Sequence, residues 1–262
     1  MTIDPASLDL DPRLHARVTR RLSTLADAAT RPGPGSRALD LGCGGGDTVS
    51  SLLTEGFDAF GCDLKFRDGL NTERLRADGR IRTIELAPYR LPFDDDSFDL
   101  VVSDQVFEHV QDYAPTIAEI ARVTRPGGVG LHIFPPRWSL REVHVMVPLG
   151  GAIQNPVWLR LWAKLGVRNP HQREASVDEV VAINRRYLQD NVNYLSRREI
   201  LRQFRRGFDV VRGVEREFLA QGRRSADAVS APVVGPVVCA IYRELRMRAI
   251  LTRNPIHKNP AK

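Results

Sequence analysis

A glycine-rich turn near the start of the chain constrains the fold more than any other feature. Residues 40–46 read Asp-Leu-Gly-Cys-Gly-Gly-Gly, after an apolar run that begins at Ala38, and a helix-like stretch follows over 48–53. A strand, a glycine turn and a helix in this order are typical of the first unit of a doubly wound α/β sheet, where the turn lies at the carboxyl edge and faces a ligand. The sequence therefore predicts such a sheet, with this turn as its binding loop.

The acidic residues at the turn indicate the charge of the ligand. A dinucleotide-binding turn carries a third glycine where this chain has Asp47, and Asp40 stands just before the first glycine. Two carboxylates at the start of a helix repel a pyrophosphate and favour a ligand that brings a positive charge. Residues 40–46 match the motif D/E-x-G-x-G-x-G, and here the chain resembles the class I S-adenosylmethionine-dependent methyltransferases. The sulfonium and amino groups of that cofactor supply such a charge.

Further landmarks of this family follow in the expected order. Residues 56–63 resemble its second strand, which ends in an acidic residue about twenty positions after the turn. The remaining landmarks are the stretch from Leu91-Pro92-Phe93 to Ser103, the helix start Val106-Phe107-Glu108-His109-Val110, and a turn over 125–128 into a fifth strand over 129–134. The resemblance thus covers residues 38–136.

The resemblance assigns cofactor binding to the turn and to the ends of the second and fourth strands. The residues are Asp40, Gly42, Cys43, Gly44, Asp63, Leu64, Ser103 and Asp104. A carboxylate at the end of the second strand can accept both hydroxyls of a ribose, which is the role expected of Asp63; the alternative is that Asp63 only caps the turn before Lys65. Many relatives carry an acidic residue near the adenine where this chain has Ala87, so we expect backbone groups or Tyr89 to hold the adenine.

The resemblance implies a Rossmann-like methyltransferase fold, an α/β sheet that is doubly wound, seven-stranded and mostly parallel. The remaining strands are expected over 82–86, up to Ser103, over 208–214 and over 248–252, the last two forming an antiparallel edge hairpin. We predict a single domain in three parts. These are 1–136, with an amphipathic helix over 11–29 and the cofactor-binding half; 137–195, a helical acceptor-site insertion after the fifth strand; and 196–262, the last helix and the strands that complete the sheet.

Helix caps and an apolar stripe mark the insertion. Asn155 and Pro156 predict a helix start, and Ser196 with Glu199 forms a capping box for the last helix. One face of the helix after Asn155 is expected to carry Trp158, Leu161, Trp162 and Leu165. Three interpretations stay open for this stripe: it covers the core, it roofs the substrate, or it enters a membrane interface. A second apolar stretch, over 228–245, contains two prolines and is too short to span a membrane.

The charge divides unevenly along the chain. Up to Pro136 there are 15 Lys and Arg residues against 21 Asp and Glu, a net charge of −6, and the rest has 23 against 11, a net charge of +12. The basic half suits a phosphorylated acceptor, an anionic membrane surface or RNA. The alternative is that these arginines only solvate the surface.

Histidines are the natural candidates for the chemistry. Methyl transfer depends mainly on alignment of the acceptor with the methyl carbon, and a hydroxyl acceptor gains from a base that titrates near neutral pH. The candidates are His109, which alternatively packs the helix or roofs the cofactor, and the pair Glu142 and His144, whose spacing lets one extended face present both. His132 lies within a strand and is expected to be structural. No carboxylate cluster has metal-ligand spacing, so we predict that the enzyme needs no metal.

A second resemblance concerns the acceptor. The spacing of Trp138, Glu142, His144 and Pro148, with Asn169 and the helix entry at Tyr194-Leu195-Ser196, is similar to a bacterial subgroup associated with glycan or glycolipid assembly. This resemblance implies O-methylation of a sugar hydroxyl. The alternatives are a small-molecule methyltransferase (for a quinone or secondary metabolite), an RNA ribose methyltransferase and a non-catalytic cofactor-binding subunit. Nucleic acid is disfavoured as a partner: no Asn-Pro-Pro-Tyr-like element follows the fourth strand, which argues against base methylation but not against ribose methylation.

The cysteines and the N-terminus favour the cytoplasm. The three cysteines have neither zinc nor disulfide spacing, and the first residues lack the layout of a signal peptide. We therefore expect a cytoplasmic protein, with peripheral membrane contact through the basic half as an alternative.

Overall fold

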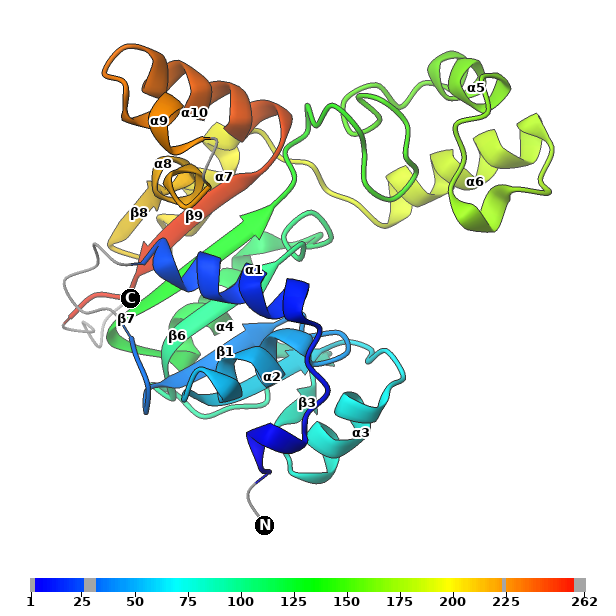
Figure 1. The fold of residues 1–262 in the computed structure, drawn as a ribbon. Coiled ribbons are helices and arrows are strands. Elements are labelled where there is room, and N and C mark those ends of the chain that lie inside the picture. The colour runs from blue at the N-terminus through cyan, green and yellow to red at the C-terminus, as the bar shows by residue number, and fades with distance from the viewer. Residues whose placement is uncertain (1–2, 26–31, 223–224, 257–262) are drawn as a thin grey trace.

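The central feature is a seven-stranded sheet in the order β3-β2-β1-β6-β7-β9-β8 (Figure 1). This computed structural model describes residues 3–25, 32–222 and 225–256. Only β9 runs antiparallel to its neighbours within the sheet described. The strands are β1 Arg37–Leu41, β2 Asp58–Asp63, β3 Ile81–Thr83, β6 Phe98–Asp104, β7 Thr124–Phe134, β8 Val210–Gly213 and β9 Arg248–Arg253. The predicted fold class is confirmed, including the antiparallel hairpin of the last two strands.

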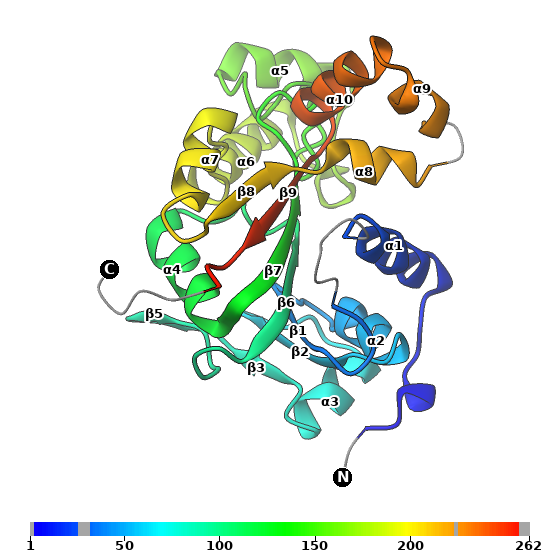
Figure 2. The same cartoon turned by 90° about the vertical axis from the view of Figure 1, so that its left-hand side faces the viewer.

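Helices cover both faces of the sheet, as Figure 2 shows. One face carries α1 Pro12–Ser23, α2 Asp47–Thr54, α3 Leu70–Ala77 and α8 Glu215–Ala220, and the other carries α4 Tyr113–Val123 and α7 Arg197–Phe204. Neighbouring residues of β1 serve opposite faces: Ala38 packs on the α2 side, whereas Leu39 and Leu41 pack on the α4 side. Strands buried on both faces read as continuous apolar runs, which is why the run before the glycine turn predicted this architecture.

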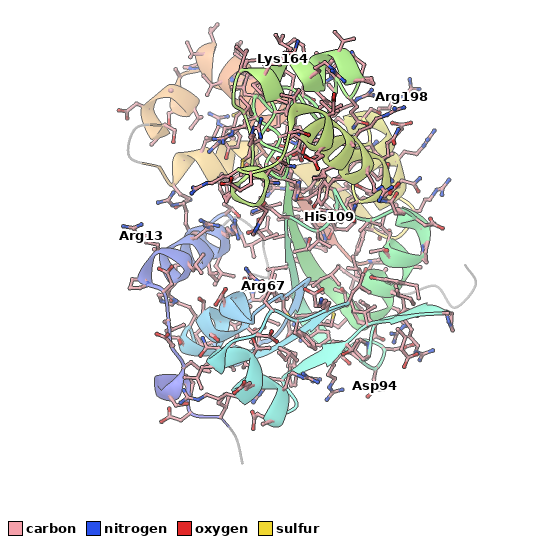
Figure 3. All side chains as sticks on the ribbon, turned by 90° about the vertical axis from the view of Figure 1, so that its right-hand side faces the viewer. Arg13, Arg67, Asp94, His109, Lys164 and Arg198 are labelled. Atoms are coloured by element: carbon pink, nitrogen blue, oxygen red, sulfur yellow. The ribbon has the colours of Figure 1, made fainter. Side chains whose placement is uncertain are left out.

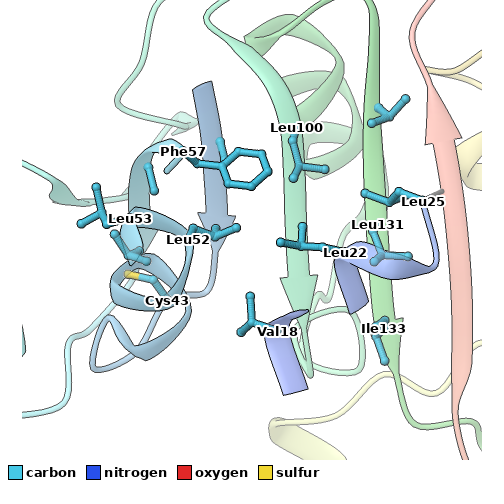
Figure 4. Close-up of a cluster of buried hydrophobic side chains, with 14 of the residues drawn as sticks. Val18, Leu22, Leu25, Cys43, Leu52, Leu53, Phe57, Leu100, Leu131 and Ile133 are labelled. Atoms are coloured by element: carbon cyan, nitrogen blue, oxygen red, sulfur yellow. The ribbon is translucent and has the colours of Figure 1, made fainter. Parts of the chain in front are cut away.

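The N-terminal helix closes one face of the sheet. Val18, Leu22 and Leu25 pack against Leu131 and Ile133 of β7 (Figure 4). The helix is shorter than the predicted span of 11–29, because it starts after the Asp11 cap and ends at Ser23. Residues 26–29 of that prediction lie outside the described residues. The apolar side of α1 faces the sheet. Residues on the other side of the helix lie at the carboxyl edge of β1.

The predicted third strand over 82–86 is wrong in extent. β3 pairs with β2 only up to Thr83, whose partner Asp63 is the last residue of β2. Beyond that point no strand remains to pair with, and the chain turns into a hairpin of β4 Glu85–Leu86 with β5 Tyr89–Arg90. This hairpin places Tyr89 beside the carboxyl edge of the sheet.

The insertion after β7 has a small core of its own and projects beyond the carboxyl end of the sheet (Figure 1). It contains α5 Pro156–Lys164, the short helix η2 Pro170–Gln172 and α6 Val177–Asp190. The buried hydrophobic residues of this core are Val145, Val147, Leu159, Ala163, Val180, Val181, Leu188 and Val192. The predicted caps are confirmed: Asn155 accepts from the backbone of Trp158, and Ser196 forms a capping box with Glu199.

The apolar stripe on α5 does not form one buried face. Leu159 and Ala163, one turn apart, are the buried residues, whereas Leu161 and Leu165 are 46% and 65% exposed. Because a helix has 3.6 residues per turn, Leu161 points nearly opposite to the buried Leu159. Leu161 and Leu165 therefore face solvent. The tryptophans pack at the edge of the insertion core, and the indole of Trp158 donates to the carbonyl of Pro148.

The last two helices pack against each other near the end of the chain. They are α9 Ala226–Ser230 and α10 Val234–Leu245, and the predicted apolar stretch over 228–245 is divided between them. Among the described helices, none has the length and apolar character needed to span a bilayer.

Candidate active site

The glycine turn after β1 has a backbone that only glycine adopts easily. Gly42, Gly44 and Gly46 have φ angles of 77°, 52° and 83°. A Cβ atom on Gly42 would collide with the side chain of Val106, and one on Gly46 would collide with Leu75. The turn therefore combines left-handed backbone with close packing, and Gly42, Cys43 and Gly44 line a cavity at the carboxyl edge of the sheet.

Asp63 joins the end of β2 to the glycine turn. Its carboxylate accepts the backbone N–H of Gly44 at 2.7 Å and that of Leu64 at 2.7 Å. Asp63 therefore caps the residues after β2, as the alternative interpretation predicted, and it caps the glycine turn as well. Asp63 still lines the cavities on both sides of it. Its role toward a ribose stays a prediction.

Two cavities meet at the carboxyl ends of β1, β2 and β6. Their volumes are about 480 and 530 Å³, and they share Gly42, Asp63 and Gln105. The first is polar and lies under α1; the second has mostly apolar walls, including Ile84, Tyr89 and Val106. Of the predicted cofactor residues, the polar cavity is lined by Asp40, Gly42, Cys43, Gly44, Asp63 and Asp104. Leu64 lines the apolar cavity.

Ser103 is the exception among the predicted cofactor residues. Its hydroxyl is buried and bonded to Nδ1 of His132 at 2.9 Å. Its side chain lines neither large cavity. His132 itself is fully buried between the rings of Phe107 and Phe204, and burial lowers its pKa to about 3. The prediction that His132 is structural is confirmed, and Ser103 is its partner.

The polar cavity is lined by acidic and basic side chains that lie close together. Asp40 is buried, and this burial together with nearby Asp104 raises the pKa of Asp40 well above its ordinary value. Asp104 pairs with Arg21 of α1 at 2.5 Å through one oxygen, while its other oxygen is buried with no hydrogen-bond partner among the described residues. Arg17, one turn before Arg21, also lines the cavity. Neither arginine is among the predicted cofactor residues, although their i, i+4 spacing beside the apolar face of α1 is visible in the sequence.

The three predicted catalytic residues come together where the sheet meets the insertion. Oε1 of Glu142 lies 2.7 Å from Nδ1 of His144 and accepts the hydroxyl of Tyr194 at 2.6 Å. The ring centroids of His144 and His109 are 4.7 Å apart. Figure 3 shows His109 between the sheet and the insertion. Residues far apart in the sequence therefore share one site.

The expectation that Glu142 and His144 share an extended face is wrong. Glu142 lies in a turn and is only 1% exposed. Its Oε2 accepts the backbone N–H groups of His144 and Val145 at 2.7 and 2.6 Å. Burial alone would raise the pKa of Glu142, but the hydrogen bonds from His144 and Tyr194 bring it below its ordinary value. Glu142 thus positions His144 and does not itself face a substrate.

Both histidines are held in the same tautomer. Nδ1 of His109 is 2.7 Å from the carbonyl oxygen of Asn191, and Nδ1 of His144 faces a carboxylate. Because both partners can only accept, each Nδ1 carries a proton, and in the neutral imidazole each Nε2 presents a lone pair. Burial lowers the pKa of His109, which favours its neutral form. His109 also lines the apolar cavity.

Known proteins resemble this chain in sequence and in fold. Residues 39–131 match a family model described as a methyltransferase domain. The chain is 35% identical over 141 residues to the demethylmenaquinone methyltransferase of Beutenbergia cavernae, covering 53% of this chain and 55% of that protein. It is 34% identical over 107 residues to the ubiquinone biosynthesis O-methyltransferase of Photobacterium profundum, covering 38% of this chain and 43% of that protein. The YcgJ protein from Bacillus subtilis has a similar fold, with a TM-score of 0.50 at 15% identity, covering 92% of this chain and 99% of that chain.

These matches concern the cofactor half of the chain most directly. Residues 39–131 are similar to a methyltransferase domain, and this similarity supports the predictions of methyl-transfer chemistry and of S-adenosylmethionine as cofactor. The chain spans about half the length of the curated relatives it matches. The relatives do not support the predicted association with glycans or glycolipids.

Proposed function

We propose that this protein is an S-adenosylmethionine-dependent methyltransferase that methylates a hydroxyl group of a small molecule. The observation that carries the proposal is the pair of cavities joined at Gly42 and Asp63, inside the segment that matches a methyltransferase domain. The relatives named above act on quinones or in ubiquinone biosynthesis, and one is an O-methyltransferase. They support the small-molecule alternative over a sugar acceptor.

The donors and acceptors of the polar cavity fit the methionine end of the cofactor. Arg17 and Arg21 suit its carboxylate, and the unpartnered oxygen of Asp104 suits its ammonium group. At the junction, Asp63 would accept the ribose hydroxyls without losing its bond to Gly44. The adenine then falls among apolar side chains, with Tyr89 beside it.

The part of the second cavity around His109, beyond the place proposed for the adenine, favours an apolar acceptor. Its walls are formed by Val106, Val110 and Pro115, together with Leu86 of the hairpin. A sugar requires many hydrogen-bonding partners, and a buried polar group left unpaired costs about 1–3 kcal/mol. An aromatic or otherwise apolar molecule with one reactive hydroxyl fits these walls better. A phosphorylated acceptor, membrane contact and cytoplasmic location stay predictions.

The proposed chemistry depends on the Nε2 atoms of His109 and His144, which carry no proton in this neutral tautomer. S-adenosylmethionine supplies an activated methyl group on sulfur, with a neutral leaving group. With the cofactor bound, Nε2 of His109 or His144 would take the proton of the acceptor hydroxyl as its oxygen bonds to the methyl carbon and the carbon–sulfur bond breaks. Glu142 keeps His144 in the required tautomer. Asn191 does the same for His109 through its carbonyl oxygen.

Calorimetry with the purified chain tests the cofactor assignment. S-adenosylmethionine and its demethylated product should both bind, and Asp63→Ala should abolish binding because the carboxylate holds the turn and faces the ribose. Asp94→Ala is the matched control, since Asp94 is an exposed carboxylate on a loop away from the cavities. Unchanged affinity in Asp63→Ala would contradict the assignment.

A labelled methyl donor then tests the acceptor. Phenolic and quinol-type small molecules should take up the label, whereas mono- and oligosaccharides should not. Transfer to saccharides alone would restore the acceptor first expected from the sequence.

A further inference from the structure

Three side chains of metal-ligand type converge beside the acceptor cavity. Glu108 and His109 follow β6 of the sheet, and His144 comes from the insertion. One ligand atom of each lies within 4.8 Å of the others. Figure 3 shows His109 at this junction. Because Glu108 and His144 are far apart in the sequence, only the folded chain brings the three together.

The two imidazoles are oriented as metal ligands are. Each donates Nδ1–H to an oxygen, His109 to the carbonyl of Asn191 and His144 to the carboxylate of Glu142. Metal-binding histidines almost always make such a bond with the nitrogen that does not face the metal. Both Nε2 lone pairs are thereby left available.

Glu108 supplies the observation that points to a cation. Its side chain is only 1% exposed, and neither carboxylate oxygen has a hydrogen-bond partner among the described residues. None of the ion pairs found in the described part of the chain involves Glu108. A buried carboxylate without a partner is costly, and here Asp104 and Glu142 act on it with the same sign of charge. A cation bound between Glu108 and the histidines satisfies all of these groups.

We propose that Glu108, His109 and His144 bind one divalent transition-metal ion, with Zn²⁺ as the reference ion. Two imidazole nitrogens and one carboxylate suit zinc or ferrous iron, whereas magnesium and calcium prefer oxygen ligands. Bonds of about 2.0–2.2 Å to a shared ion bring donor atoms to within about 4.4 Å of one another. Small side-chain rotations therefore complete the site.

The role of this ion rests on the proposed function. Three protein ligands leave open positions, and His109 lines the cavity in which the acceptor is placed. An acceptor hydroxyl bound to the ion loses its proton to water more easily, and its oxygen then forms the bond to the methyl carbon as the carbon–sulfur bond breaks. In this form the histidines hold the ion and do not take the proton. The proposed ion departs from the expectation of metal independence, which considered only carboxylates close in sequence.

Zinc binding to the chelator-treated full chain is the test. Calorimetric titration with Zn²⁺ alone should show one site, and Glu108→Gln and His144→Ala should each weaken it at least tenfold. His171→Ala is the control, since His171 is an exposed histidine of the same insertion. The absorption spectrum of the Co²⁺-loaded protein should change in Glu108→Gln and not in the control. Glu108→Gln keeps the side-chain shape, so it stays informative if His144→Ala folds poorly.

Each outcome decides the matter. No zinc binding by the wild type, or equal binding by wild type and Glu108→Gln, would overturn the site. Tighter binding of Mg²⁺ than of Zn²⁺ would overturn the assignment to a transition metal. Zinc binding without binding of S-adenosylmethionine would leave the site standing and remove the proposed function. Cofactor binding and methyl transfer by the metal-free protein would leave the proposed function standing and remove the proposed role of the ion.

Discussion

The cofactor region, residues 37–104, and the insertion, residues 137–195, build their parts of the site in different ways. In the cofactor region, the residues that shape the site come from one turn and the ends of adjacent strands, and Asp63 reaches Gly44 across neighbouring strands. In the insertion, His144 depends on Glu142, which in turn depends on Tyr194, and the pair becomes a site only against His109. The proposed cofactor site is formed by residues of neighbouring strands and one turn, whereas the proposed acceptor side is assembled from segments that are far apart in the sequence.

The largest effect is expected at the glycine turn. Gly44→Val should abolish cofactor binding, because the position has a φ of 52° and the side chain would enter the cavity edge beside Arg67. Gly79→Val is the matched control, since Gly79 has a φ of 68° in open space. Both variants should lose a similar amount of stability, about 1–2 kcal/mol in chemical unfolding. Loss of cofactor affinity in both would mean that backbone strain, not the cavity, is responsible.

The next effect separates the two regions functionally. His144→Ala should lower turnover by about 10²-fold or more and leave the affinity for S-adenosylmethionine unchanged, because His144 lies on the acceptor side. His171→Ala serves again as the control. Steady-state kinetics and calorimetry on the same preparations give both quantities. Equal turnover in wild type and His144→Ala would remove His144 from the site and leave His109 as the candidate.

The separate core of the insertion predicts a contrast between two leucines of one helix. Leu159→Ala should reduce the free energy of unfolding by about 2–5 kcal/mol, because Leu159 is fully buried. Leu161→Ala should change it by less than about 0.5 kcal/mol, since Leu161 faces solvent. Urea unfolding of the two variants measures the difference. Similar losses would show that the α5 stripe is one buried face after all.

The smallest predicted effect concerns the core of the sheet. The pKa of His132 is about 3 in the folded protein and about 6.5 when unfolded, so the unfolded chain takes up the proton first. Stability from this residue is complete above pH 6.5 and is lost as the pH falls toward 3. By pH 5 the loss is about 2 kcal/mol. His132→Gln lacks this titration, so the difference between wild type and variant should shrink by that amount from pH 7 to pH 5; parallel curves would contradict the prediction.

Local pattern was sufficient for much of the cofactor region. The glycine turn, the acidic end of β2 and the helix caps at Asn155 and Ser196 depend on residues within a few positions of one another. The sheet topology was implied by the family resemblance that these landmarks carry along residues 38–136. Short-range backbone preferences and buried apolar runs are written directly in the sequence, which is why these features were predictable.

Long-range packing decided what the pattern missed. The third strand stopped at Thr83 because β2 ends at Asp63, and α5 buried Leu159 because the insertion has its own core. The cluster of Glu108, His109 and His144 exists only where the insertion folds back on the sheet. Spacing along a chain reports neighbours within one element, but it carries no information on which elements meet in space. The cofactor turn could therefore be predicted from residue order, and the acceptor side appeared only in the folded chain.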